Sequence, residues 1–217
     1  MNGREPFAFT TEQRLVSLTG LQATNLEQLL EHLRKAPGSS IFYHTHHMYL
    51  SHHFETPWFS NDFALWVSEA LQEEELGEKL AAIDLLSFSS IRDLREAIIG
   101  KVERRVSEDG RRRNECPKGD EFHFCRSKSF IFPTGLVAHD VAEFFRLLPF
   151  VTTASVFFHF FEARLRLGRP TNDFSAWLAW RGQEDLAKAI EVIDPYTMTL
   201  DEFKDRLVAL GKDRKAQ

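Results

Sequence analysis

The sequence predicts a mainly α-helical α+β protein made of two tandem repeats, each a short β-hairpin followed by about five helices, packed as a pseudo-twofold pair. Three observations carry this prediction: motifs that recur at a fixed spacing, aromatic runs at the start of each half, and helical periodicity behind them. We expect the repeats at residues 1–100 and 120–217, with a polar, basic linker at 101–119.

The repeat is visible in short motifs. Thr19-Gly20-Leu21 recurs as Thr134-Gly135-Leu136, a shift of 115 residues (134 − 19), which also places Ser40, Phe42 and His44 on Ser155, Phe157 and His159. Further along, Asn61-Asp62-Phe63 and Trp66 recur as Asn172-Asp173-Phe174 and Trp177, now at a shift of 111 residues (172 − 61). Self-similarity at a nearly constant spacing indicates duplication and two similar halves.

Each half opens with two short apolar runs, which are Phe7–Phe9 with Leu15–Leu18, and Phe122–Phe124 with Phe130–Phe132. Polar residues such as Thr10-Thr11 and Ser127-Lys128 lie between the runs. Apolar runs bounded by polar turn residues are typical of a hairpin, and we expect the Thr-Gly pair to end it.

Helical signals follow. Thr24 or Asn25 can cap a helix that buries one face, formed by Leu26, Leu29, Leu30 and Leu33. Ser39 or Ser40 can start a second helix with an apolar stripe of Phe42, His46, Leu50 and Phe54. Asn61 and Asn172 are expected to cap later helices, with an aspartate in the first turn of each.

Composition excludes several classes of protein. With 43% hydrophobic residues and a net charge of −5, the chain has a globular composition and no basic field, so nucleic acid is not the expected partner. The two cysteines give no disulfide framework, and no apolar run is long enough to cross a bilayer. We therefore expect a cytoplasmic protein. The arginine runs at 104–105 and 111–113 are expected to be solvated linker.

The densest polar feature is a histidine cluster in residues 44–53, which holds His44, His46, His47, His52 and His53. The repeat provides an internal comparison. His44 matches His159 and His47 matches Glu162, whereas His46 matches Phe161 on the apolar stripe. His52 and His53 lie where the alignment breaks, and the sequence assigns them no role.

Two interpretations of the matched residues remain open. Residues three apart share a helix face, so His44, His47, His159 and Glu162 could together hold Zn, Mn or Fe, or place a general base beside a water molecule. Alternatively, His44 and His159 are structural staples, each hydrogen-bonded to an aspartate, Asp62 or Asp173. Trp66 and Trp177 are then expected in the core, also as part of the staple.

The phenylalanine–histidine helix around Phe42-Tyr43-His44, followed by Asn61-Asp62-Phe63 and Trp66, resembles an uncharacterised prokaryotic family of unknown function. The resemblance covers nearly the whole chain and implies a prokaryotic, cytoplasmic protein without a known activity or catalytic residue. We expect a non-catalytic binding or regulatory module with two pseudo-symmetric faces and a protein partner. The alternative is a metal-dependent enzyme, of hydrolytic type, with its site between the repeats. The sequence does not determine the oligomeric state.

Overall fold

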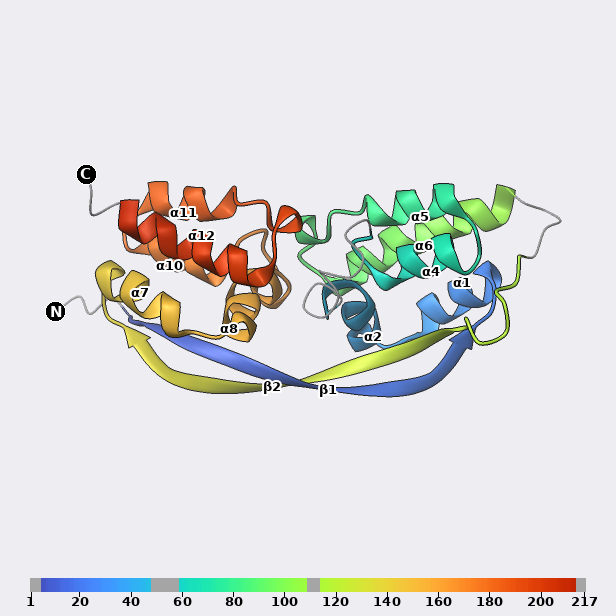
Figure 1. Cartoon of the computed structure of the whole chain (residues 1–217), viewed down its shortest axis with the longest axis horizontal. Coiled ribbons are helices and arrows are strands. Elements are labelled where there is room, and N and C mark those ends of the chain that lie inside the picture. Colours follow the sequence, from blue (N-terminus) through green and yellow to red (C-terminus); the bar gives the residue numbers. More distant parts are fainter. Residues whose placement is uncertain (1–4, 48–58, 109–113, 214–217) are drawn as a thin grey trace. The chain divides into compact units, whose positions relative to one another are not determined.

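The computed structural model describes residues 5–47, 59–108 and 114–213. The described chain is mainly helical with two long strands, β1 (Phe7–Ala23) and β2 (Phe122–Ala138), which pair as an antiparallel two-stranded sheet (Figure 1). The helices after β1 are α1 (Leu26–Lys35), α2 (Gly38–Phe42), α4 (Asp62–Glu69), α5 (Glu74–Ala81) and α6 (Ile91–Glu108). Those after β2 are α7 (Val141–Leu147), α8 (Thr153–Phe157), α9 (Ala163–Leu167), α10 (Asp173–Trp180), α11 (Glu184–Glu191) and α12 (Leu200–Asp213).

The predicted hairpins are wrong, because each is one continuous strand of 17 residues. Thr10-Thr11 and Ser127-Lys128, taken as turns, are extended. They lack the glycine or asparagine that a tight hairpin turn needs, and β-branched threonine favours a strand. The strand also continues past each Thr-Gly pair, where Gly20 and Gly135 have φ values of +83° and +79° that a side chain would oppose.

Helix capping follows the sequence closely. Asn25 caps α1, and Asn61 and Asn172 cap α4 and α10 with side-chain oxygens that accept backbone N–H groups. The second helix, α2, begins one residue earlier than expected, at Gly38, after Pro37. It then widens into a π-helix, η1 (Tyr43–His47), and the same change occurs after α8 in η4 (Phe158–Glu162).

The stretch predicted as linker is partly helical. Residues 101–108 continue α6, because Val102 is buried on the same face as Ile98 and Ile99. Residues 109–113, which include Arg111-Arg112-Arg113, lie outside the described residues.

The chain divides into two compact units that do not follow the order of the sequence. The first unit is Arg14–Lys128, and the second unit is Met1–Gln13 with Ser129–Gln217. Each unit therefore combines the helices of one half with the N-terminal strand segment of the other half. The boundaries at 1–100 and 120–217, and the pseudo-twofold packing, stay predictions.

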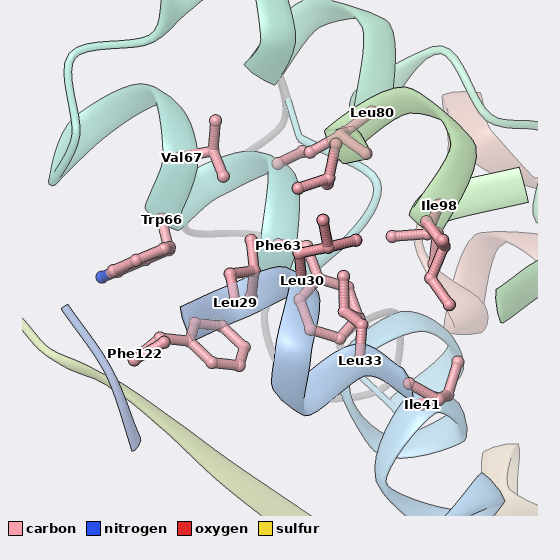
Figure 2. Packing of buried hydrophobic residues seen from close by; sticks show 14 of the residues in the cluster. Leu29, Leu30, Leu33, Ile41, Phe63, Trp66, Val67, Leu80, Ile98 and Phe122 are labelled. Carbon is pink, nitrogen blue, oxygen red and sulfur yellow. The ribbon is translucent and has the colours of Figure 1, made fainter. Parts of the chain in front are cut away.

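Phenylalanine side chains anchor the exchanged strand segments. In the first unit, Phe122 and Phe124 join a core of apolar side chains from α1, α4, α5 and α6, and the ring centroids of Phe122 and Trp66 are 5.5 Å apart (Figure 2). In the second unit, Phe7 lies 5.3 Å from Phe144 and 5.6 Å from Trp177. Aromatic edge-to-face contacts of this kind stabilise a core beyond the area that they bury.

Candidate functional site

His44 is the centre of a buried hydrogen-bond chain in the first unit. Its Nδ1–H donates to Oδ2 of Asp62 (2.7 Å), and its Nε2 accepts the backbone N–H of Cys125 (2.8 Å). Since a carboxylate only accepts and a backbone N–H only donates, these partners define a neutral imidazole with its hydrogen on Nδ1. Both ring nitrogens are used, and the residue is only 3% exposed.

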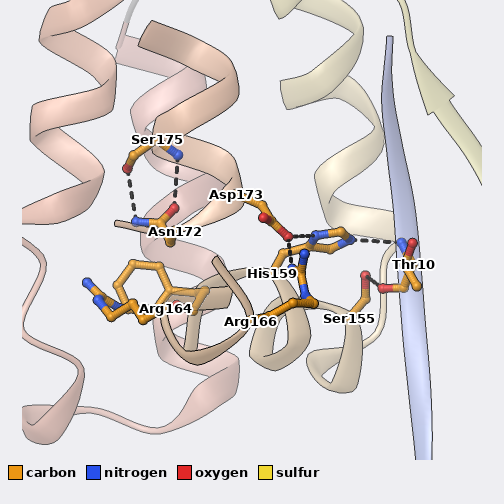
Figure 3. A network of polar contacts seen from close by, with 9 residues as sticks. Thr10, Ser155, His159, Arg164, Arg166, Asn172, Asp173 and Ser175 are labelled. Atoms are coloured by element: carbon orange, nitrogen blue, oxygen red, sulfur yellow. Dashed lines mark hydrogen bonds and ion pairs between the residues drawn. The ribbon is translucent and has the colours of Figure 1, made fainter. Parts of the chain in front are cut away.

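His159 makes the same two bonds in the second unit. Its Nδ1–H donates to Oδ2 of Asp173 (2.8 Å), and its Nε2 accepts the backbone N–H of Thr10 (2.8 Å), as Figure 3 shows. Thr10 and Cys125 are related by the 115-residue shift. Each histidine therefore links a helix to the strand segment that the other half of the chain contributes.

A tryptophan on the next helix holds the beginning of the same strand segment. Trp66 Nε1 donates to the backbone oxygen of Asp120 (2.6 Å), and Trp177 Nε1 donates to that of Glu5 (3.1 Å). Both indoles are 9% exposed, consistent with the core position expected from the sequence. The histidine and the tryptophan thus fix each strand segment at two points, and the two buried phenylalanines of the segment lie between those points.

The four residues predicted as ligands of one metal ion are not described together in one site. His44 and His159 belong to separate compact units, and each binds its own aspartate. His47 stacks on Tyr43 with ring centroids 4.9 Å apart, because the π-helix changes the alignment of side chains that a three-residue spacing assumes. Glu162 ends η4. Within the described residues, no group of three or more histidine, cysteine or carboxylate side chains is arranged to hold a metal ion.

His46 is buried in the first unit, where the other half has Phe161. Its ring lies parallel to that of Phe42 at 5.0 Å, and Nδ1 is 2.9 Å from Oγ1 of Thr45. Burial, with a smaller contribution from the charge of Arg14, lowers the pKa of His46 to about 3. The side chain is therefore neutral at physiological pH. His52 and His53 lie outside the described residues.

The cysteines do not have the environment of reactive thiols. Burial raises the pKa of Cys125, and nearby Asp62 raises it further. Cys125 contributes its backbone N–H to the site. The sequence did not predict this role for Cys125, nor the equivalent role for Thr10. A backbone group carries no residue-type signal, although the repeat shift does relate the two positions.

Comparison with known proteins gives the chain a family. Residues 4–212 match the family of unknown function DUF5752. The structure of OrfY from Thermoproteus tenax, an archaeon, is similar at a TM-score of 0.82 with 29% sequence identity, covering 100% of this chain and 99% of the other. No curated protein matches the chain. In the described part of the chain, no helix is both long and apolar enough to cross a membrane. The resemblance to a prokaryotic family of unknown function is confirmed, and the chain belongs to DUF5752.

Proposed function

We propose that the chain is a non-catalytic binding module, with the histidine–aspartate pairs acting as staples that hold exchanged strand segments. One observation carries the proposal: both ring nitrogens of His44 and of His159 are engaged by groups of the protein itself. A general base or a metal ligand needs a ring nitrogen that can reach a substrate, a water molecule or an ion. These two histidines offer none without breaking the strand attachment.

In each unit separately, the exposed apolar residues of its strand segment are the proposed contact surface for a partner. Leu15 and Leu18 are 63% and 67% exposed on β1, and Ile131 is 53% exposed on β2. Large exposed apolar side chains such as these are available to contact a partner. The net charge of −5 favours a protein over nucleic acid as the occupant. The corresponding positions of the two strands would give two pseudo-symmetric faces.

The staple role is tested with His44→Phe and His159→Phe, which keep a ring in the core and remove both hydrogen bonds. His44→Phe takes the ring partner from the Asp62 carboxylate and from the N–H of Cys125. His159→Phe does the same to the N–H of Thr10, whereas Asp173 keeps its ion pair with Arg166. Each buried polar group left without a partner costs about 1–3 kcal/mol. We expect each variant to lower the melting temperature by roughly 5–15 °C, measured by circular dichroism. Unchanged melting temperatures would contradict the staple role.

The contact surface is tested with the double variant Leu15→Ser/Leu18→Ser. Its stability should match that of the wild type, because exposed side chains contribute little to stability. The melting temperature should stay within about 2 °C of the wild type. A partner that binds the immobilised wild type, and then binds the purified wild type but not the variant, supports the surface. Equal binding to both proteins contradicts it.

The metal-dependent hydrolase with His44, His47, His159 and Glu162 as ligands stays a prediction. Elemental analysis of the full chain, purified without a histidine tag, tests it directly. A stoichiometric metal that is lost in His44→Phe would favour the enzyme, and its absence would reject that site.

A further inference from the structure

In the second unit, the protein's own arginines occupy the surroundings of Trp177 and Asp173. The guanidinium carbon of Arg181 lies 4.8 Å from the centre of the Trp177 ring, and its Nη2 donates to the backbone oxygens of Glu5 (3.1 Å) and His139 (2.7 Å). Arg166 forms an ion pair with Asp173 (Figure 3). Here a guanidinium group lies over the tryptophan and a second one neutralises the aspartate.

The first unit keeps the tryptophan and the aspartate but lacks both arginines. The 111-residue shift places Ala70 at the position of Arg181, and the 115-residue shift places Ser51, outside the described residues, at that of Arg166. Beside Trp66 and Asp62 there is instead a cavity of about 550 Å³. Ala70 lines this cavity, at the position that Arg181 has in the second unit.

The cavity is lined by groups that suit a cation. Four carboxylate residues contribute to its wall, namely Asp62, Glu69, Asp120 and Glu121. Hydrogen bonds from backbone N–H groups, including that of Gly119, lower the pKa of Glu121, which keeps it ionised. His123 also lines the cavity, and Lys118 acts on Glu121, yet the carboxylates outnumber these basic groups.

The aromatic and backbone groups of the two sites also correspond. The backbone oxygen of Glu5 accepts hydrogen bonds from both Trp177 and Arg181, and its counterpart on Asp120 accepts one from Trp66. A carbonyl oxygen has two lone pairs, so Asp120 can accept a second donor from the cavity. Trp66 presents its ring beside Phe122, as Figure 2 shows.

We propose that this cavity of the first unit binds the guanidinium group of an external ligand, stacked on Trp66 and held by Asp120 and the surrounding carboxylates. The second unit holds its own guanidinium in the equivalent place. A planar group with several N–H donors fits a tryptophan face and carbonyl and carboxylate acceptors better than a compact ammonium does. The ligand is an arginine, either as the free amino acid or as a side chain of a protein. The proposal does not depend on the strand surface described above.

The test is a titration of the full chain with small-molecule probes. Calorimetry measures the affinity, and NMR records the signals of the tryptophan indole N–H groups. The probes are N-acetyl-L-arginine amide and free L-arginine, and the matched control is N-acetyl-L-citrulline amide, which replaces the charged guanidinium with a neutral urea. We expect the arginine probe to shift the Trp66 signal and to bind about tenfold or more tightly than the citrulline probe. Equal affinity for N-acetyl-L-arginine amide and its citrulline control, or no binding by either arginine compound, would overturn the proposal.

Two variants locate the site. Ala70→Arg restores the side chain of the second unit, should fill the cavity from within, and should abolish binding of the probe. Glu69→Gln is the milder variant and should weaken binding about threefold by removing one charge. Unchanged binding in both variants would place the site elsewhere and contradict the proposal.

Two further comparisons separate the sources and the proposals. Equal affinity for free arginine and the blocked amide would indicate the amino acid as ligand, and preference for the amide would indicate a protein side chain. Binding that persists in Leu15→Ser/Leu18→Ser shows that the cavity acts independently, so failure of the strand surface and failure of the cavity remain distinguishable.

Discussion

The two compact units share one device and differ in what surrounds it. Each holds a strand segment of the other half through a histidine, an aspartate and a tryptophan, with corresponding distances that agree within 0.1 Å for the histidine–aspartate bonds. Around this device the first unit has a buried His46 and an open acidic cavity, whereas the second has Phe161 and two arginines. The shared residues hold the strand segment in both units. The residues around them can therefore differ between the units without loss of the fold.

The largest expected effect concerns the exchanged strand segment. A fragment of residues 14–128 contains the whole first unit, whereas residues 14–120 lack Phe122, Phe124 and the N–H of Cys125. Removing a buried phenylalanine side chain costs about 3–5 kcal/mol, and two such losses are comparable to the whole stability expected of a small domain. We expect 14–128 to unfold cooperatively on heating and 14–120 to show no cooperative transition by circular dichroism.

The predicted first domain, residues 1–100, is the control for this comparison. It contains β1 but not the segment of β2 that packs against α4, and we expect it to be unfolded. Cooperative unfolding of 1–100 at the temperature of 14–128 would show that strand exchange is not required for a stable unit.

The second effect is acid sensitivity, which should distinguish the units through His46 and Phe161. The pKa of His46 falls from an ordinary value of 6.5 to about 3 on folding, so the unfolded chain binds a proton that the folded chain does not. The contribution of the neutral His46 to stability is therefore fully present above pH 6.5 and is lost as the pH falls toward 3. At pH 5 this loss is about 2 kcal/mol.

His46→Phe copies the residue of the second unit and should remove this loss. The free energy of unfolding, from urea titrations at pH 7 and pH 5, should fall less in the variant than in the wild type. Phe161→His, at a site that stacks on Phe157 at 5.1 Å, should add a similar acid sensitivity. If His46→Phe leaves the difference between pH 7 and pH 5 unchanged, the buried histidine is not its source.

Sequence reasoning reached the local features and missed the long-range ones. Asn25, Asn61 and Asn172 could be assigned as helix caps because a cap depends on residues three positions away. Each histidine could be matched with an aspartate because both recur in step, and those contacts occur at 2.7 and 2.8 Å.

The exchange of strand segments could not be predicted. An apolar run such as Phe122–Phe124 has the same alternation whether its partner is the next run in a hairpin or a distant strand. The π-helix at His44 also left no pattern in the sequence, because its i→i+5 backbone hydrogen bonds require no particular residue type. Ala70 lines the acidic cavity, and nothing in its own sequence context marks it until it is compared with Arg181 of the other unit.

The smallest effect tests whether the strand attachment is equally complete in both units. Ser155 Oγ donates to the backbone oxygen of Thr10 (2.7 Å), beside the bond from Thr10 to His159. Ser40 occupies the equivalent position, is fully buried, and its Oγ has no hydrogen-bond partner within the described residues. A buried hydroxyl without a partner is unfavourable, whereas a made bond contributes about 1 kcal/mol.

Ser155→Ala should therefore lower the free energy of unfolding by about 1 kcal/mol, and Ser40→Ala should leave it unchanged or raise it slightly. Urea titrations of the two variants under one set of conditions measure the difference, and both substitutions remove the same atom from the same local structure. An equal cost at both positions would mean that Ser40 also bonds the strand, and the two attachments would then be equivalent. A smaller cost at Ser40 means that the first unit holds its strand with one bond fewer, which leaves the segment beside the acidic cavity the more easily displaced of the two.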